Sequence, residues 1–164
     1  MSFIASGGPA APPESDTLPN SPWWPAVSFA AWRAASRIDR TAQDPQALAA
    51  LGEGIARVNA QLNGWFGIAT ALARTQPPYI EASTLADLPD PPHQAPGWRV
   101  ARYLRAVHCY ADSLLAESLR DFDSTAEGHQ RADAMEGRID AYRREAQYAI
   151  ADIIDMPRRR VELL

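Results

Sequence analysis

The sequence contains no lysine and a single cysteine, and both shortages limit what the protein can be. All sixteen basic residues are arginine, which we attribute mainly to the base composition of the source genome; selection for the forked contacts of guanidinium groups is the alternative. Since Cys109 is alone, no disulfide can form within the chain, and a reducing compartment fits. The net charge of −4 argues against a protein that wraps nucleic acid, because such proteins carry a basic stripe.

Long apolar runs are absent as well. No window approaches the ~18 consecutive apolar residues of a membrane span. No basic residue precedes Arg33, and the N-terminal region has no apolar run of signal-peptide length. We therefore expect no membrane association and a protein that stays in the cytoplasm unless a larger assembly carries it out.

The usual motifs of catalysis and metal binding are also missing. His93, His108 and His129 are scattered, and the sequence has no HExxH motif, no paired CxxC and no glycine-rich phosphate loop. His108 and Asp112 share a helix face at the i, i+4 spacing, which suits either a surface hydrogen bond or a catalytic dyad. We favour the hydrogen bond, and we predict no enzymatic activity, no metal and no cofactor.

Prolines divide the chain. Six of the fourteen lie in the first 25 residues beside glycines and serines, which predicts an extended or disordered arm over residues 1–24. Six more lie between residues 77 and 96 and predict a long crossover without regular structure. Pro45 and Pro157 stand alone, at a predicted helix start and a predicted helix end.

Apolar periodicity between the prolines predicts four helices. The first covers about residues 28–41, and the second begins at Asp44–Pro45 and runs for about 30 residues. Its apolar positions form two seven-residue series, which are Leu48, Ile55, Leu62 and Ala69, and Leu51, Val58, Trp65 and Leu72. The third covers about residues 98–122, with an inner face made of Val100, Leu104, Val107, Ala111, Leu114 and Ser118.

The fourth predicted helix starts at a capping box formed by Ser124 and Glu127 and stops before Pro157. Its buried face is predicted at Ala132, Met135, Ile139, Tyr142, Ala146, Ala149 and Ile153. No segment alternates with period two, so we predict no sheet. The fold class is all-α, an irregular antiparallel bundle of about four helices over residues 25–156, with a proline-rich crossover and extended terminal arms. A fourth helix that leaves the core to meet a neighbour is the alternative.

Two groups of residues are candidates for contacts with partners. The first is the C-terminal tail over residues 157–164, which either frays or docks on a partner through Arg158, Arg159, Arg160, Val161, Leu163 and Leu164. The second group lies near the N-terminus. Trp23 and Trp24 either pack on their own bundle or contact a neighbouring subunit. Similarly, Arg33, Arg37 and Arg40 form either a solvated face or a contact with an acidic surface.

Several short segments occur in an order and spacing that resemble a known family. They are Trp23–Pro25, Leu85–Pro89, Arg105–Val107, Asp123–Ala126, Gln130–Asp133 and Pro157–Arg158. Together, from about Trp23 to Leu164, the chain resembles the head completion (GPL-type) proteins of temperate contractile-tailed phages.

This resemblance implies a structural adaptor of the virion, located at the head–tail connector and present in the host cytoplasm during assembly. Such proteins join the portal vertex after DNA packaging, stabilise the filled head and form the platform for tail attachment. The implied partners are the portal protein, bound by the C-terminal tail, about twelve copies of the chain in a closed ring, and a neck or tail-completion protein. Packaged DNA would pass without specific binding. The alternative is a small helical DNA-binding or regulatory protein that uses Arg33, Arg37 and Arg40.

Overall fold

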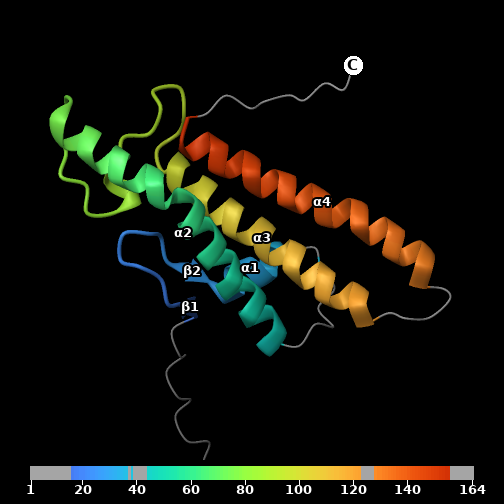
Figure 1. Cartoon of the computed structure of the whole chain (residues 1–164). Coiled ribbons are helices and arrows are strands. Elements are labelled where there is room, and N and C mark those ends of the chain that lie inside the picture. The colour runs from blue at the N-terminus through green and yellow to red at the C-terminus, as the bar shows by residue number, and fades with distance from the viewer. Residues whose placement is uncertain (1–15, 37, 39–43, 123–127, 156–164) are drawn as a thin grey trace, which may run out of the picture.

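The computed structural model describes residues 16–36, 38, 44–122 and 128–155, and helices dominate it (Figure 1). The elements are β1 (Thr17–Leu18), β2 (Val27–Ser28), α1 (Phe29–Ala35), α2 (Asp44–Thr75), the 3-10 helix η1 (Leu85–Asp87), α3 (Trp98–Phe122) and α4 (Gly128–Ile153). The predicted all-α class of about four helices is therefore confirmed. The predicted bounds of the second and third helices also agree with α2 and α3.

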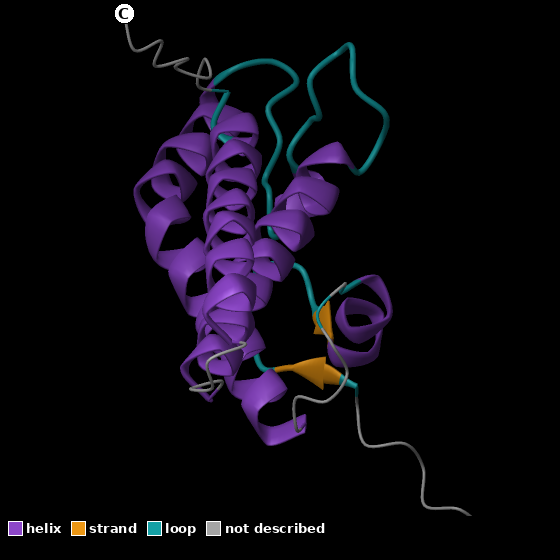
Figure 2. Ribbon diagram, turned by 90° about the vertical axis from the view of Figure 1, so that its right-hand side faces the viewer, coloured by secondary structure: helices purple, strands orange, loops and turns teal. Residues whose placement is uncertain are grey.

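The central element is α3, which lies between α2 and α4, while α2 and α4 touch each other little (Figures 1 and 2). The middle of α3 is buried on several sides. Its buried residues there include Tyr103, Ala106, Val107, Tyr110, Ala111, Ser113, Leu115 and Ala116. The predicted single inner face of this helix is therefore wrong in part. Val107 and Ala111 are buried as expected, but Leu104 and Leu114 are only half-buried, because two long helices cover α3 from different directions.

Close packing of α2 on α3 explains one glycine in the middle of a helix. A Cβ on Gly54 would lie 2.9 Å from the carbonyl oxygen of Val107 and 3.2 Å from the amide nitrogen of Ala111. On either side of this contact, Leu51, Val58 and Leu62 are fully buried. The two seven-residue series thus point into the core at Leu51, Ile55, Val58 and Leu62, whereas Leu48, the first predicted member of one series, is 41% exposed.

The predicted buried face of α4 is confirmed at Ile139, Ala146, Ala149 and Ile153, which are all buried. Tyr142, also predicted there, is only half-buried, and the side chains of Ala132 and Met135 lie outside the described residues. Three ion pairs also cross between α3 and α4, namely Arg102–Asp152 at 3.4 Å, Arg105–Glu145 at 2.7 Å and Glu117–Arg143. The predicted capping box at Ser124 and Glu127 lies outside the described residues.

The first helix is shorter than predicted. α1 ends at Ala35, because Ser36 is extended (ψ 135°) and donates its hydroxyl to Asp112 on α3, with 2.8 Å between Oγ and Oδ1. At the start of α1, the side chain of Ser28 accepts a hydrogen bond from the amide of Ala31. The hydrogen bond between Ser36 and Asp112, which ends the helix, cannot be predicted from the spacing of apolar residues.

The prediction that the protein has no sheet was also wrong, because one small sheet is present. β1 and β2 form an antiparallel pair in which Thr17 lies opposite Ser28 and Leu18 lies opposite Val27. Strands of two residues are too short to show period-two alternation. Asp16 then joins the pair to α1, because its backbone and side-chain oxygens accept the amides of Phe29 and Ala30 at 2.8 Å.

The proline-rich crossover is mostly irregular, although η1 interrupts it. Its order comes from carboxylates that accept backbone amides. Asp87 accepts the amides of Ser83 and Thr84, and these bonds hold the pKa of its carboxyl below the usual value. Asp90 accepts the amides of Gly97 and Arg99 at 2.6 and 2.9 Å, and thereby caps the start of α3.

Candidate interaction surfaces

The two halves of α2 differ in burial. All of the buried residues of this helix lie in its proximal half, residues 44–62, and none lies in its distal half, residues 63–75. Both views show the distal half diverging from α3 and α4 toward the crossover (Figures 1 and 2). A helix end with no buried residue would normally carry charges.

The distal half carries almost none. No charged residue lies between Arg57 and Arg74, so every face of the helix over residues 58–73 is uncharged. Ile68 is 61% exposed and Leu72 is 46% exposed, and Tyr79 just beyond the helix is 66% exposed. An exposed apolar face of this kind is a candidate surface for contact with a partner. This surface was not among the predicted sites, although the charge-free run is visible in the sequence alone.

Two glycines lie on the same exposed part of the helix. A Cβ added to Gly64 or Gly67 would meet no atom within 4 Å. Glycine inside a helix costs up to about 1 kcal/mol relative to alanine, and unlike Gly54 these two gain nothing from contacts within the chain. Because neither glycine has a Cβ, another backbone could approach the distal half closely at these two positions.

Beside the distal half lies an open cavity of about 220 Å³, which the crossover and the end of α4 border on its other sides. Its apolar lining includes Trp65, Ala69, Leu72, Ala73, Ile80, Leu88, Ile153 and Ile154. The backbone around it is fixed, because the amide of Ile80 donates to the carbonyl of Ala73 at 2.7 Å. We call this space the terminal cavity.

Arg99 is the basic residue in the lining of the terminal cavity, and it joins three elements. Its guanidinium donates to the carbonyl oxygen of Pro89 at 3.1 Å and to that of Ile153 at the C-terminal end of α4. It also lies over the ring of Trp65, with 5.8 Å between Cζ and the centroid. Burial lowers the pKa of Arg99, while Asp90 and Asp155 act in the opposite direction.

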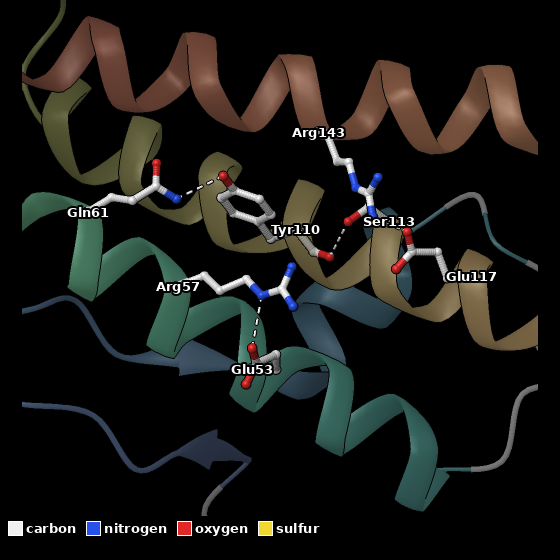
Figure 3. Close-up of polar contacts among 7 residues, drawn as sticks. All are labelled: Glu53, Arg57, Gln61, Tyr110, Ser113, Glu117 and Arg143. Atoms are coloured by element: carbon white, nitrogen blue, oxygen red, sulfur yellow. Dashed lines mark hydrogen bonds and ion pairs between the residues drawn. The ribbon is translucent and has the colours of Figure 1, made fainter.

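Elsewhere, polar side chains inside the bundle are bonded to one another. The amide of Gln61 on α2 donates to the hydroxyl of Tyr110 on α3 at 2.8 Å, as Figure 3 shows, and Gln147 on α4 donates to the same hydroxyl. Nearby, the hydroxyl of Tyr103 donates to Asn59 at 2.8 Å. Burial raises the pKa of Tyr103 to about 12, although hydrogen bonds from Asn20 and with Asn59 act against this rise. These junctions hold the three long helices together.

The paired tryptophans pack on their own bundle, which was one of the two alternatives. Trp23 is buried and lies edge-on to Phe66, with 4.5 Å between ring centroids, and Trp24 stacks on Tyr103 at 5.2 Å. The amide of Leu85 also donates to the carbonyl of Trp23. This packing uses part of the predicted 1–24 arm. A further contact of Trp24 with a neighbouring copy stays a prediction.

Of the three arginines predicted on the first helix, only Arg33 falls within the described residues. Its guanidinium pairs with Asp44 at 3.2 Å and lies over the rings of Phe29 and Trp32. Arg37 and Arg40 lie outside, as do all the residues of the C-terminal tail, Arg158, Arg159, Arg160, Val161, Leu163 and Leu164.

The His108–Asp112 pair does not form the expected surface hydrogen bond. Asp112 is buried, and its Oδ1 accepts instead from Trp32 Nε1 at 3.0 Å and from Ser36. Burial raises the pKa of Asp112 and lowers the pKa of His108. Burial also raises the pKa of the neighbouring Cys109 thiol to about 11. Asp112 therefore anchors α1 to α3. In the described part of the chain, no three metal-ligating side chains come together.

None of the helices in the described ranges combines the length and apolarity that a membrane crossing requires.

Comparison with known proteins identifies the family of the chain. A family model described as phage head completion protein (GPL) matches residues 18–164. The chain is also similar to a head completion/stabilization protein of Escherichia phage P2, with 27% identity over 145 residues, which cover 88% of this chain and 81% of that protein. No solved structure matches significantly. The family has a structural role in the phage head. The chain belongs to the phage head completion protein (GPL) family.

Proposed function

We propose that this protein joins the portal vertex of the DNA-filled head, stabilises the packaged genome and forms the platform on which the tail is attached. The observation that carries the proposal is the exposed, uncharged distal half of α2 in a chain that belongs to a head completion family. On this proposal the protein is located at the head–tail connector of the virion, and in the host cytoplasm before assembly.

The surface chemistry favours a protein partner over nucleic acid. An apolar face without charges cannot neutralise phosphates, whereas the centres of protein interfaces are depleted in charge and rich in apolar side chains. The net charge of −4 also suits a channel through which DNA passes without specific binding. Family membership therefore favours the structural role over the alternative of a small DNA-binding regulator.

Copies of the chain would pack side by side in a ring of about twelve, as the twelve-fold portal implies. The distal half of α2 provides one face for this contact, and Trp24, Arg33, Arg37 and Arg40 are candidates for the other. The end of the bundle opposite the portal would face the neck or tail-completion protein.

The C-terminal tail, residues 157–164, would dock on the portal protein. Pro157 separates the tail from α4, so its removal should cost the bundle little. Burial of Leu163 and Leu164 would stabilise the contact by roughly 1.5–3 kcal/mol each, and forked contacts from Arg158 and its neighbours would add to it. Repetition around a ring would make such modest contacts persistent.

The test is truncation after Met156, with a full-length variant carrying Leu163→Ser and Leu164→Ser as the matched control for chain length. Both proteins are expected to keep the melting temperature of the wild type within a few degrees, since a 1 kcal/mol loss shifts it by about 2–4 °C at this size. Filled heads produced with either protein should leak DNA or fail to accept tails. Normal head completion by both variants would refute the role of the tail.

A further inference from the structure

The crossover carries an exposed tip just beyond α2. This crossover tip, residues 76–81, begins where the distal half of α2 ends (Figure 1). Tyr79 is 66% exposed, the largest exposed fraction among the large apolar side chains of the described residues. Its φ of 57° lies in the left-handed region, which tyrosine rarely adopts, and strained residues of this kind cluster at binding sites. The fold therefore holds an aromatic ring out toward solvent.

Hydrogen bonds fix the crossover tip against α2. The amide of Tyr79 donates to the carbonyl of Gln76 at 2.8 Å, and the amide of Ile80 donates to the carbonyl of Ala73 in α2 at 2.7 Å. The next residue, Glu81, is exposed, and its carboxylate has no partner among the described residues. Because the tip is already ordered, it loses little conformational entropy when it binds a partner.

A groove lies between α1, α3 and α4, and we call it the three-helix groove. Its volume is about 760 Å³, within the ~300–1,000 Å³ of sites that take a ligand. Its lining includes Ala35 at the end of α1, Leu104 on α3 and Tyr142 on α4. Aliphatic and aromatic walls of this kind suit a large aromatic side chain.

The polar side chains of the three-helix groove leave one positive charge without an ion pair. Arg105 and Glu145 pair with each other at 2.7 Å, and Asp112 accepts two hydrogen bonds from α1 and its C-cap. Burial lowers the pKa of His108, so its ring adds no charge. Arg138 has no ion-pair partner among the described residues, although its charge acts on Asp112 from a distance. The groove therefore offers a guanidinium to a carboxylate.

We infer that the crossover tip of one copy docks in the three-helix groove of the next copy. The ring of Tyr79 packs on Leu104 and Tyr142. The carboxylate of Glu81 accepts hydrogen bonds from Arg138. This inference rests on the proposed function, in which copies pack side by side in a ring, and it identifies two surfaces that meet there.

The crossover tip cannot reach the groove of its own chain. Ile80 and Ile153 line the same terminal cavity, so the tip lies beside the C-terminal end of α4. Arg138 precedes Ile153 by about 22 Å along this helix, at ~1.5 Å per residue. The chain thus carries both halves of the contact at separate places, and a second copy is needed to join them.

Charge favours this arrangement over a symmetric contact between two tips. In a tip-to-tip contact, two Glu81 carboxylates would approach each other, and like charges repel. In the tip-to-groove contact, Glu81 meets Arg138 instead. A contact between two different surfaces also repeats from copy to copy, so that it builds a ring rather than a dimer.

The experiment reverses the two charges, singly and together, in the full-length protein. Glu81→Arg and Arg138→Glu should each lower in vitro head completion by at least about tenfold, because every contact in the ring then brings like charges together. The double variant restores opposite charges and should complete heads within about threefold of the wild type. Arg144→Glu is the matched control, because Arg144 is exposed on α4 and does not line the groove.

Tyr79→Ser tests the apolar part of the contact without a change in α4. Because the ring is largely exposed in one copy, its loss should leave the melting temperature within a few degrees of the wild type. Head completion should fall by at least about tenfold, since aromatic side chains dominate binding at interfaces. Thermal unfolding of every variant separates effects on assembly from effects on folding.

Loss in the three single variants, recovery in the double variant and an unchanged control support the inference. Completion at the wild-type level by any of Glu81→Arg, Arg138→Glu and Tyr79→Ser overturns it. A double variant that completes heads no better than the single ones also overturns it, as does an equal loss in Arg144→Glu. The proposed function fails separately, if heads that receive none of this protein retain their DNA and accept tails.

Discussion

The two halves of α2 belong to one continuous helix, yet they meet different environments. The proximal half carries Asp44, Glu53 and Arg57 on its outside and buries Leu51, Ile55, Val58 and Leu62 inside. The distal half has neither a buried residue nor a charge before Arg74. The same seven-residue series runs through both, so the pattern of apolar residues does not distinguish them.

The difference shows that a periodic series of apolar residues indicates which side chains are favoured to be buried. It does not indicate which element, or which other protein, buries them. In the proximal half, α3 provides it within the chain. In the distal half, the apolar side chains of Trp65, Phe66, Ala69 and Ala73 are covered in part, and Ile68 and Leu72 remain open. A protein that acts by joining an assembly can leave this cover to its partners.

Truncation of one leucine in each half should give the largest difference in the free energy of unfolding. Leu62→Ala removes a fully buried side chain and is expected to lower the free energy of unfolding by about 2–5 kcal/mol. Leu72→Ala removes a half-exposed one and should cost about 1 kcal/mol or less. Urea denaturation of both variants gives the two values. Equal losses would show that the distal half is covered within the monomer.

Glycine substitutions should move stability in opposite directions. Gly54→Ala forces a methyl group against the backbone of α3 and should destabilise the protein by about 1–3 kcal/mol. Gly64→Ala enters open space in a helix and should stabilise the monomer by up to about 1 kcal/mol. Thermal unfolding of the two variants measures the difference. A stable Gly64→Ala monomer that no longer completes heads would assign the glycine to close approach of a partner.

Alkaline pH should weaken the contact between α3 and the proximal half of α2, where the hydroxyl of Tyr103 donates to Asn59. The pKa of Tyr103 is about 12 in the folded protein, above the unfolded value of about 10, so the folded state holds its proton longer. Stability from this group is present below pH 10 and is lost as pH rises from about 10 to 12. Tyr103→Phe should remove that part of the pH dependence, of about 1–3 kcal/mol.

The measurement for Tyr103 is urea denaturation of both proteins at several pH values, because Cys109, whose pKa is also raised, remains in each and cancels in the difference. Parallel curves for the two proteins above pH 10 would contradict the assignment.

The smallest effect on stability is expected for a charge on the open face. Ile68→Asp should change the free energy of unfolding by no more than about 0.5 kcal/mol, because the side chain is largely exposed. In an assembly, the same charge would be buried without a partner, so head completion should fall sharply. Chemical denaturation measures the effect on stability, and an in vitro head completion assay measures the effect on assembly. Normal assembly by the variant would remove Ile68 from any interface.

Local signals fixed much of the helical framework from the sequence. Asp44 followed by Pro45 marks the start of α2, and the proline cluster over residues 77–96 marks the gap before α3. These signals work because capping and the missing amide of proline act within a few residues.

Tertiary structure alone decided what each helix face meets. Burial of α3 on several sides, the end of α1 at Ser36 and the bonds of Asp112 to Trp32 and Ser36 all join residues far apart in the sequence. The exposed distal half of α2 and the terminal cavity arise in the same way, from how far α3, α4 and the crossover extend along this helix. Sequence periodicity reports the apolar side of a helix, whereas the packing of distant elements determines which part of that side remains uncovered.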